Sequence, residues 1–186
     1  VGEHFSDSGA HEIQLASMAS ADFEKALEFM YTGRCSFSEE QLQSVLEVAC
    51  RLQVEALQAV AEFAVRERID ESSCVDALLL ADRLSLPALT AAANALALKH
   101  FEALATSGRG SSFEKLTLEQ LCDLLRDDRL RAAEHVVFDV VTHWLAARPA
   151  ASEDAERQLL EQVRFPRIES SIMAGRVDCT PLAGRS

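Results

Sequence analysis

The chain has 186 residues, of which 48% are hydrophobic, 26% are charged and only 6% are aromatic. This apolar content is enough to bury a sizeable core and argues against a disordered chain. The formal net charge is −12, and residues 1–104 alone hold 17 acidic against 7 basic side chains. Nucleic acids and anionic membranes attract clustered Lys and Arg, so the composition argues against both as partners.

The sequence contains no run of about 18 apolar residues, so a transmembrane helix is not expected. It begins at Val1 rather than Met and shows no signal-peptide pattern, and we expect a fragment or a processed product. Five cysteines are widely spaced without a CxxC pair, which favours neither a zinc site nor a disulfide framework. Because no disulfide framework is indicated, we expect the protein in a reducing compartment, the cytoplasm and also the nucleus.

The first elements along the chain are short. Residues 12–15 alternate polar and apolar side chains, which predicts a short strand. A helix is then expected over 20–31, with Ser20 as its N-cap and Gly33 just past its end. The apolar residues of this helix have helical spacing and predict one inner stripe: Phe23, Ala26, Leu27 and Met30.

Two more helices are expected before residue 70. Ser38 and Gln41 have capping-box spacing and start the first of them. This helix buries one face, and after a break near residues 52–53 the next helix does the same. The expected core residues are Leu42, Val45, Leu46 and Ala49 in the first helix and Val54, Leu57, Ala61 and Ala64 in the second.

The helix pair expected over 73–101 has an unusually wide apolar stripe. Ala77, Leu80 and Ala81 form one face, and Leu78 with Leu79 widens it. Two interpretations stay open: a groove for a partner protein, or burial of two faces inside a helical stack. Pro87 fits the first turn of the second helix because its missing N–H is not needed there.

The second half continues the helical pattern after a loop at 107–112. Thr117 and Gln120 form another capping box, ahead of an apolar face that includes Leu121 and Leu125. A helix over 133–147 carries Trp144, and Ser152 caps a last one. The predicted fold is therefore all-α, built of stacked antiparallel helix pairs, with at most one or two very short strands.

No catalytic, cofactor-binding or metal site is expected. His135 and His143 lie eight residues apart, and no Cys or carboxylate completes a metal-binding set between them. Arg neighbours make Cys35 and Cys50 candidates for redox-sensitive thiols, but structural cysteines are the favoured interpretation. Tyr31 and Trp144 lie on apolar stripes and are expected to pack in the core.

Several segments resemble, in order, the landmarks of the kelch-like (BTB-BACK-kelch) family. Residues 23–33 (FEKALEFMYTG) are similar to the late BTB pattern F-x-x-x-L-x-F-x-Y-T-G, and residues 46–53 resemble the L-x-x-A-x-x-L-Q that follows. Residues 73–82 resemble the start of the 3-box. Residues 113–137, with Trp144 and residues 163–166, resemble the BACK domain.

The resemblance implies the C-terminal part of a BTB domain at 1–69, the 3-box and BACK domain at 70–168, and a flexible tail at 169–186. It further implies a non-catalytic substrate adaptor of a cullin-3 RING E3 ubiquitin ligase. The partner would be the N-terminal domain of cullin-3, and the full-length protein is a candidate homodimer. The resemblance places the rest of the BTB domain and the kelch repeats outside this chain.

The implied cullin contacts are six residues. Phe5 and Asp7 loosely match the family's apolar-x-Glu motif, and the others belong to the BTB end and the 3-box: Tyr31, Val75, Leu78 and Leu79. A kelch-like cytoskeletal or structural scaffold that binds no cullin is the alternative function, and a small helical enzyme is a third. Without the first half of the BTB domain, we expect apolar surface to be exposed on the helix at 21–31 and also at 39–51.

Overall fold

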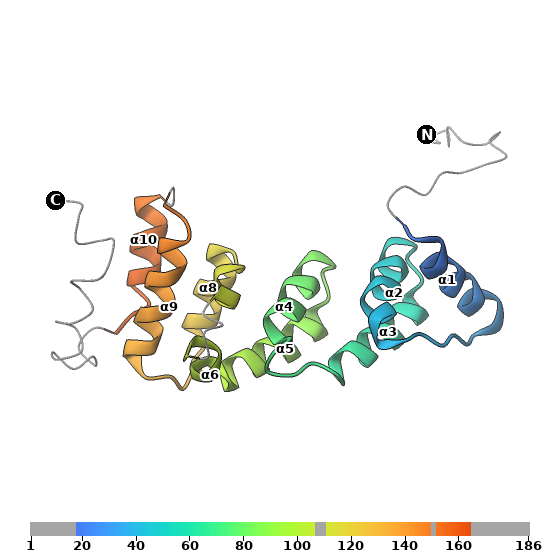
Figure 1. Ribbon diagram of the computed structural model, residues 1–186, viewed down its shortest axis with the longest axis horizontal. Coiled ribbons are helices and arrows are strands. Elements are labelled where there is room, and N and C mark those ends of the chain that lie inside the picture. The colour runs from blue at the N-terminus through green and yellow to red at the C-terminus, as the bar shows by residue number, and fades with distance from the viewer. Residues whose placement is uncertain (1–17, 107–110, 150–151, 165–186) are drawn as a thin grey trace, which may run out of the picture. The chain divides into compact units, whose positions relative to one another are not determined.

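The computed structural model describes residues 18–106, 111–149 and 152–164, which form ten helices and no strand (Figure 1). The all-α prediction is confirmed for these residues. The strand expected at 12–15 lies outside them. Within the described residues, no helix is long and apolar enough to span a membrane. The chain divides into two compact units, residues 1–65 and 66–186.

The first unit contains three helices: α1 (Ser20–Thr32), α2 (Glu39–Arg51) and α3 (Glu55–Arg66). Helix α1 packs against α2. Their shared core is made of side chains that are almost completely inaccessible to solvent, namely Ala26, Val45, Val48, Ala49 and Leu57. The buried face predicted for α2 is confirmed.

The ends of α1 are set by local backbone chemistry. The N-cap is Ala19 rather than the predicted Ser20, a difference of one residue. At the other end Gly33 has a φ of 68°, and its N–H donates to the carbonyl oxygen of Phe29 at 2.8 Å. Glycine adopts this left-handed conformation without steric cost and so ends the helix, as predicted.

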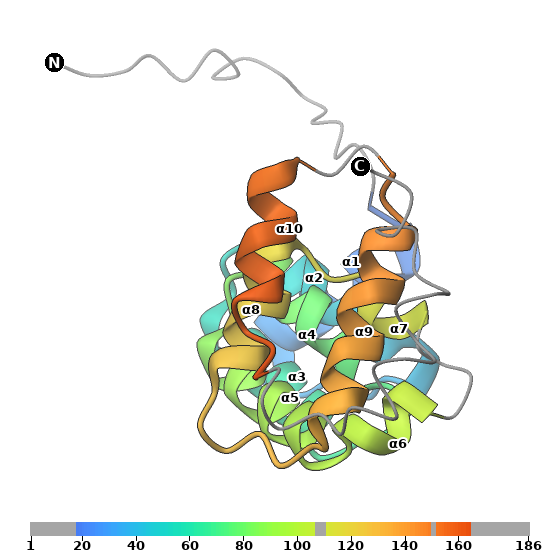
Figure 2. The same ribbon diagram turned by 90° about the vertical axis from the view of Figure 1, so that its left-hand side faces the viewer.

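The second unit holds the remaining helices. They are α4 (Cys74–Arg83), α5 (Pro87–Lys99), α6 (Phe101–Thr106), α7 (Ser111–Glu114), α8 (Leu118–Arg126), α9 (Glu134–Ala146) and α10 (Glu153–Leu160). Helix α4 packs along α5, and α9 contacts α6, α7 and α10. Figure 2 shows α9 and α10 beside each other. Among successive helices, α4 packs on α5, α5 contacts α6, and α9 contacts α10.

Helices α8 and α10 begin with the caps that the sequence predicts. The backbone N–H of Gln120 donates to Thr117 Oγ1 at 3.2 Å, while Gln120 Oε1 accepts from the Thr117 N–H at 2.9 Å. At α10 the N–H of Ala155 donates to Ser152 Oγ at 3.2 Å. These side chains satisfy N–H groups that have no partner within the helix.

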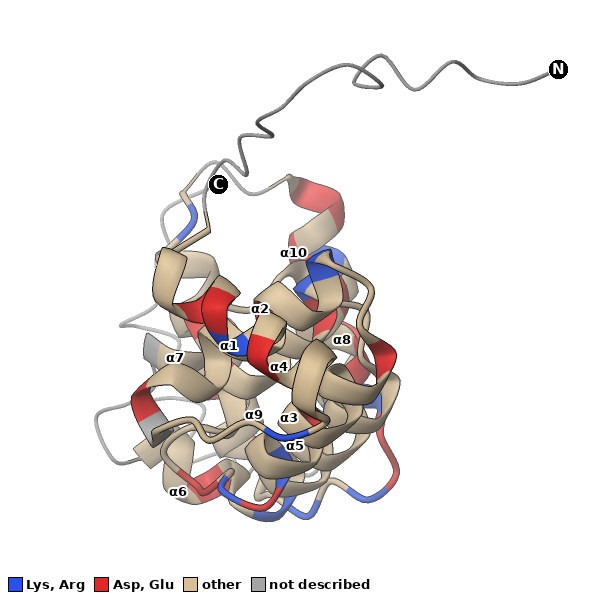
Figure 3. Ribbon diagram, turned by 90° about the vertical axis from the view of Figure 1, so that its right-hand side faces the viewer, with Lys and Arg blue, Asp and Glu red and all other residues tan. Residues whose placement is uncertain are grey.

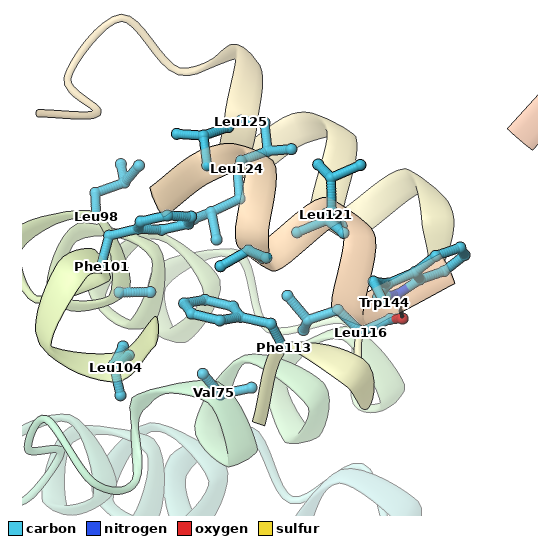
Figure 4. Packing of buried hydrophobic residues seen from close by; sticks show 14 of the residues in the cluster. Val75, Leu98, Phe101, Leu104, Phe113, Leu116, Leu121, Leu124, Leu125 and Trp144 are labelled. Carbon is cyan, nitrogen blue, oxygen red and sulfur yellow. Dashed lines mark hydrogen bonds between the residues drawn. The ribbon is translucent and has the colours of Figure 1, made fainter. Parts of the chain in front are cut away.

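One continuous apolar core joins the helices of the second unit (Figure 4). The rings of Phe101 and Phe113 lie 4.8 Å apart and are tilted by 36°. Trp144 is only 3% exposed, and its indole N–H donates to the carbonyl oxygen of Leu116 at 2.9 Å. The core position predicted for Trp144 is therefore confirmed, and its polar atom has the partner that burial requires.

The turns before α3 and α5 have the same hydrogen-bond pattern. Gln53 and Ser85 each have a φ of 55°. The next N–H donates back across the turn, from Val54 to Ala49 and from Leu86 to Ala81. This is the Schellman arrangement, with a non-glycine residue in the left-handed position. The two turns connect α2 to α3 and α4 to α5. In each turn the left-handed conformation of a non-glycine residue raises the free energy of the folded chain.

Candidate protein-interaction surfaces

The C-terminal end of α1 exposes two large apolar side chains. Tyr31 is 86% exposed and Met30 is 49% exposed. The expectation that Tyr31 packs in the core is therefore wrong, and so is the place of Met30 in the inner stripe. The stripe is buried at Ala26, while Phe23 and Leu27 are half-buried. Helical spacing grouped these residues, but α2 covers only part of the face that they share.

Polar contacts hold this end of α1. Lys25 Nζ and Glu28 Oε2 form an exposed ion pair of 3.2 Å. Thr32 Oγ1 donates to the Glu28 carbonyl at 2.5 Å and accepts from the N–H of Arg34 at 3.1 Å. Figure 3 marks acidic and basic residues along the ribbon of α1 in red and blue. Tyr31 thus lies at a helix end held by these polar contacts, and its exposed ring is accessible to a partner.

Helix α3 presents a second exposed apolar surface. Val60 is 47% exposed and Phe63 is 60% exposed, and Ala56 and Ala59 are also exposed. Sequence reasoning identified only the buried face with Leu57 and Ala61. The signal for the other face is present, since residues 56, 59, 60 and 63 have the i, i+3, i+4, i+7 spacing of one helical stripe. Helix α2 shows no comparable exposure: Leu42, Val45 and Leu46 are all buried, contrary to the expectation for 39–51.

The predicted 3-box contacts lie mainly inside the second unit. Val75 and Leu78 are each 3% exposed and belong to its core. Leu79 is half-buried against the same core. Burial on two faces therefore accounts for the wide stripe of α4 in this structure. Whether these residues contact a partner stays a prediction, and Phe5 and Asp7 lie outside the described residues.

A surface groove of about 590 Å³ lies beside the α4–α5 turn. Its lining is mostly small or polar and comprises Ala81, Asp82, Ser85, Leu86, Pro87, Thr90, Ala91, Asn94 and Arg129. Its two charged side chains already have partners. Arg129 pairs with Asp127 at 2.6 Å, and Asp82 accepts from Gln120 Nε2 at 3.0 Å. The charge of Arg129 is thus balanced by a carboxylate, whereas Asp82 keeps its negative charge because Gln120 is neutral.

The cysteines of the described residues have the character of structural thiols. Burial raises the pKa of Cys35, and the nearby Glu28 carboxylate raises it further. Burial also raises the pKa of Cys50, with Glu62 and Glu47 adding to the effect. A raised pKa lowers the thiolate fraction at neutral pH and with it the reactivity. Among the described residues no His, Cys, Asp and Glu cluster could hold a metal ion.

Comparison with family models accounts for both units of the chain. Residues 1–69 match the BTB/POZ domain, and residues 74–178 match BACK, the BTB And C-terminal Kelch domain. The BACK match alone covers more than half of the chain.

Curated proteins similar to the chain are named kelch-like proteins. Kelch-like protein 38 of Rattus norvegicus is 28% identical over 165 residues, or 89% of this chain and 28% of the relative. Kelch-like protein 7 of Homo sapiens is 28% identical over 177 residues, or 95% of this chain and 30% of the relative. Kelch-like protein 3 of Mus musculus is 27% identical over 174 residues, or 93% of this chain and 29% of the relative.

The fold and its exposed apolar surfaces are those of a protein-interaction module, consistent with a BTB domain that makes protein–protein contacts. The chain belongs to the BTB-BACK family of kelch-like proteins. It spans less than a third of the length of the curated relatives that it matches.

Proposed function

We propose that this chain is the cullin-binding part of a substrate adaptor for a cullin-3 RING E3 ubiquitin ligase. The supporting observation is Tyr31, an aromatic side chain that is 86% exposed at the capped end of α1. Large aromatic residues contribute a disproportionate share of binding energy when a partner desolvates them. Family membership supports the same role, because the segment that carries Tyr31 lies within the BTB match.

In this proposal the chain catalyses nothing. It recruits the N-terminal domain of cullin-3. The contact surfaces belong to the C-terminal part of the BTB domain at 1–69 and to the 3-box and BACK domain at 70–168. The tail at 169–186 follows these domains. Substrates would bind elsewhere in the full-length protein, which would act as a homodimer in the cytoplasm or nucleus. The raised pKa values of Cys35 and Cys50 also argue against a cysteine nucleophile.

Calorimetric titration with the N-terminal domain of cullin-3 tests the proposal. We expect the unmodified chain to bind in the micromolar range or tighter, and Tyr31→Ala to weaken binding by about 10-fold or more. Phe5→Ala tests the predicted N-terminal contact in the same way. Phe63→Ala is the matched control, because Phe63 is an exposed aromatic residue on a different helix of the first unit and should leave the affinity unchanged.

Two outcomes would contradict the proposal. One is a folded chain that does not bind cullin-3, which would favour the scaffold function instead. The other is binding that is insensitive to Tyr31→Ala, which would remove the observation on which the proposal rests. Far-ultraviolet circular dichroism of each variant shows whether the helices are intact.

A further inference from the structure

The hydroxyl group of Tyr31 is open to chemistry from outside the chain. Tyr31 is the only tyrosine in the sequence, and its side chain is 86% exposed. A tyrosine usually buries its ring and hydrogen-bonds its hydroxyl. Within the described residues Tyr31 Oη forms no hydrogen bond. An enzyme can therefore reach Oη without opening the core of the first unit.

The backbone around Tyr31 also favours access by an enzyme. Tyr31 lies in the last turn of α1, which ends where the N–H of Gly33 donates to the carbonyl oxygen of Phe29. Residues 34–38, between α1 and α2, are not helical. The ends of helices open at a much lower free energy than their interiors. Opening this one turn lets Tyr31 and the residues after it bind in extended form in the groove of an enzyme.

The charges around Tyr31 change sign along the sequence. Glu24 and Glu28 lie seven and three residues before it, and Arg34 lies three residues after it. All three side chains are exposed. Protein kinases select their substrates partly by such charge patterns. Acidic residues before the acceptor suit a tyrosine kinase whose substrate groove is basic at that position.

We propose that Tyr31 is a phosphate-acceptor site for a protein tyrosine kinase, and that its phosphorylation weakens cullin binding. The second half of this inference rests on the proposed function. In the transfer, Tyr31 Oη forms a bond to the γ-phosphorus of ATP while the bond from that phosphorus to the β–γ bridging oxygen breaks. ADP leaves, and the phenolic proton passes to the catalytic base of the kinase.

The phosphate acts on binding through its charge. It adds about two negative charges at the C-terminal end of α1. The carbonyl groups at this end already give it a partial negative charge, and Glu28 lies about one turn before Tyr31. The last turn of α1 is therefore weakened. A partner that buries the ring must also remove water from the charged phosphate, so cullin-3 should bind about 100-fold more weakly.

Incubation of the full 186-residue chain with ATP and the catalytic domain of a broad-specificity tyrosine kinase tests the acceptor site. Intact-mass spectrometry should show one added phosphate, because the chain has one tyrosine. Tyr31→Phe should take up none. A synthetic peptide of residues 24–38 is the reference for the same sequence without the fold. We expect the folded chain to react within about 10-fold of the rate of the peptide, because only one helical turn has to open.

Calorimetric titration of the phosphorylated chain with the N-terminal domain of cullin-3 tests the effect on binding. We expect an affinity about 100-fold below that of the untreated chain. Treatment of the same sample with a tyrosine phosphatase should restore the original affinity. This reversal shows that the loss comes from the phosphate and not from damage to the protein. Circular dichroism measured before and after phosphorylation reports the loss of helix at the end of α1.

Three results would overturn the proposal. In the first, the peptide is phosphorylated but the folded chain is not, so the fold protects Tyr31. In the second, neither is phosphorylated, so the sequence is not a kinase substrate. In the third, the phosphorylated chain binds cullin-3 as tightly as the untreated one. If the untreated chain does not bind cullin-3 at all, the proposed function fails together with the second half of this inference, while the kinase assay still decides whether Tyr31 is an acceptor.

Discussion

The guanidinium carbon of Arg148 lies 4.0 Å from the centre of the Trp144 ring. Arg148 Nη2 also donates to the carbonyl oxygens of Glu114 at 2.5 Å and Leu116 at 3.1 Å. Trp144 donates to the same Leu116 oxygen. Trp144 near the C-terminal end of α9 and Arg148 just beyond it therefore bind carbonyl groups at the end of α7 and just after it, a place where backbone carbonyls lack partners within the helix. This pair of side chains joins two segments about 30 residues apart in the sequence.

Arg148→Met should destabilise the second unit by about 1–2 kcal/mol. Methionine keeps the packing of the aliphatic stem but loses the cation–π contact and the hydrogen bonds to the two carbonyls. Urea unfolding followed by the fluorescence of Trp144 measures the change. Arg157→Met is the control, because Arg157 is exposed and its ion pair with Asp154 is 3.8 Å long. A loss of stability in the control as large as in Arg148→Met would contradict the assignment.

Ser85→Gly should stabilise the second unit by about 0.5 kcal/mol. Ser85 has a φ of 55°, a conformation that is higher in free energy for residues with a side chain than for glycine. The gain is partly offset because glycine has more conformational entropy in the unfolded chain. Ser85→Val should have the opposite effect, since a β-branched side chain fits this conformation poorly. The midpoint of urea unfolding gives both signs. If both variants shift the midpoint in the same direction, the conformational explanation is wrong.

Stability of the second unit should fall as the pH drops from about 4 to about 2. The carboxylate of Asp70 accepts hydrogen bonds from the side chains and backbone N–H groups of Ser72 and Ser73, which lower its pKa to about 2. The folded pKa lies below the unfolded value of 3.8. The stabilisation is therefore present above the unfolded pKa and is lost as Asp70 protonates in the folded protein.

Asp127 contributes to the same pH window, because its hydrogen bonds with Arg129 lower its pKa to about 2 as well. The urea midpoint is measured from about pH 5 to about pH 2, a range that spans the folded and unfolded pKa values of both carboxylates. Comparison with a variant that lacks Asp70 gives the contribution of Asp70 alone. In Asp70→Asn the loss of stability at low pH should be smaller, because one titrating carboxylate is removed. The double variant Ser72→Ala, Ser73→Ala should reduce this loss only in part, since it removes the side-chain hydrogen bonds to Asp70 and keeps the backbone ones. If the urea midpoint of Asp70→Asn changes with pH as steeply as that of the unmodified chain, Asp70 does not contribute to the pH-dependent stability.

The cysteines should react slowly with a thiol reagent at neutral pH. Burial raises the pKa of Cys74 and Cys122, as it does for Cys35 and Cys50. The thiolate is the reacting form, so each of the four should modify more slowly than free glutathione. A Cys179→Ser background with Ellman's reagent measures the four rates together. A fast phase in the folded chain that disappears in Cys35→Ser would show an activated thiol after all.

The sequence by itself determined the elements whose causes are local. Gly33 ends α1, and the Thr117–Gln120 capping box starts α8, because these interactions lie within one turn of the chain. Helical spacing likewise predicted the buried face of α2 and the core position of Trp144. The family patterns also depend on short segments, which is why the resemblance could be stated before the structure.

Only the tertiary structure decided which apolar face is covered. Tyr31 and Leu78 both lie on apolar helical stripes, yet one is 86% exposed and the other 3%. Spacing shows that residues share a face, but exposure depends on whether another helix packs over that face. The same reason explains why the exposed apolar face of α3 was missed and why the contact of Arg148 with Trp144 and Leu116 could not be foreseen. Such contacts are fixed by the packing of distant segments, which no local pattern encodes.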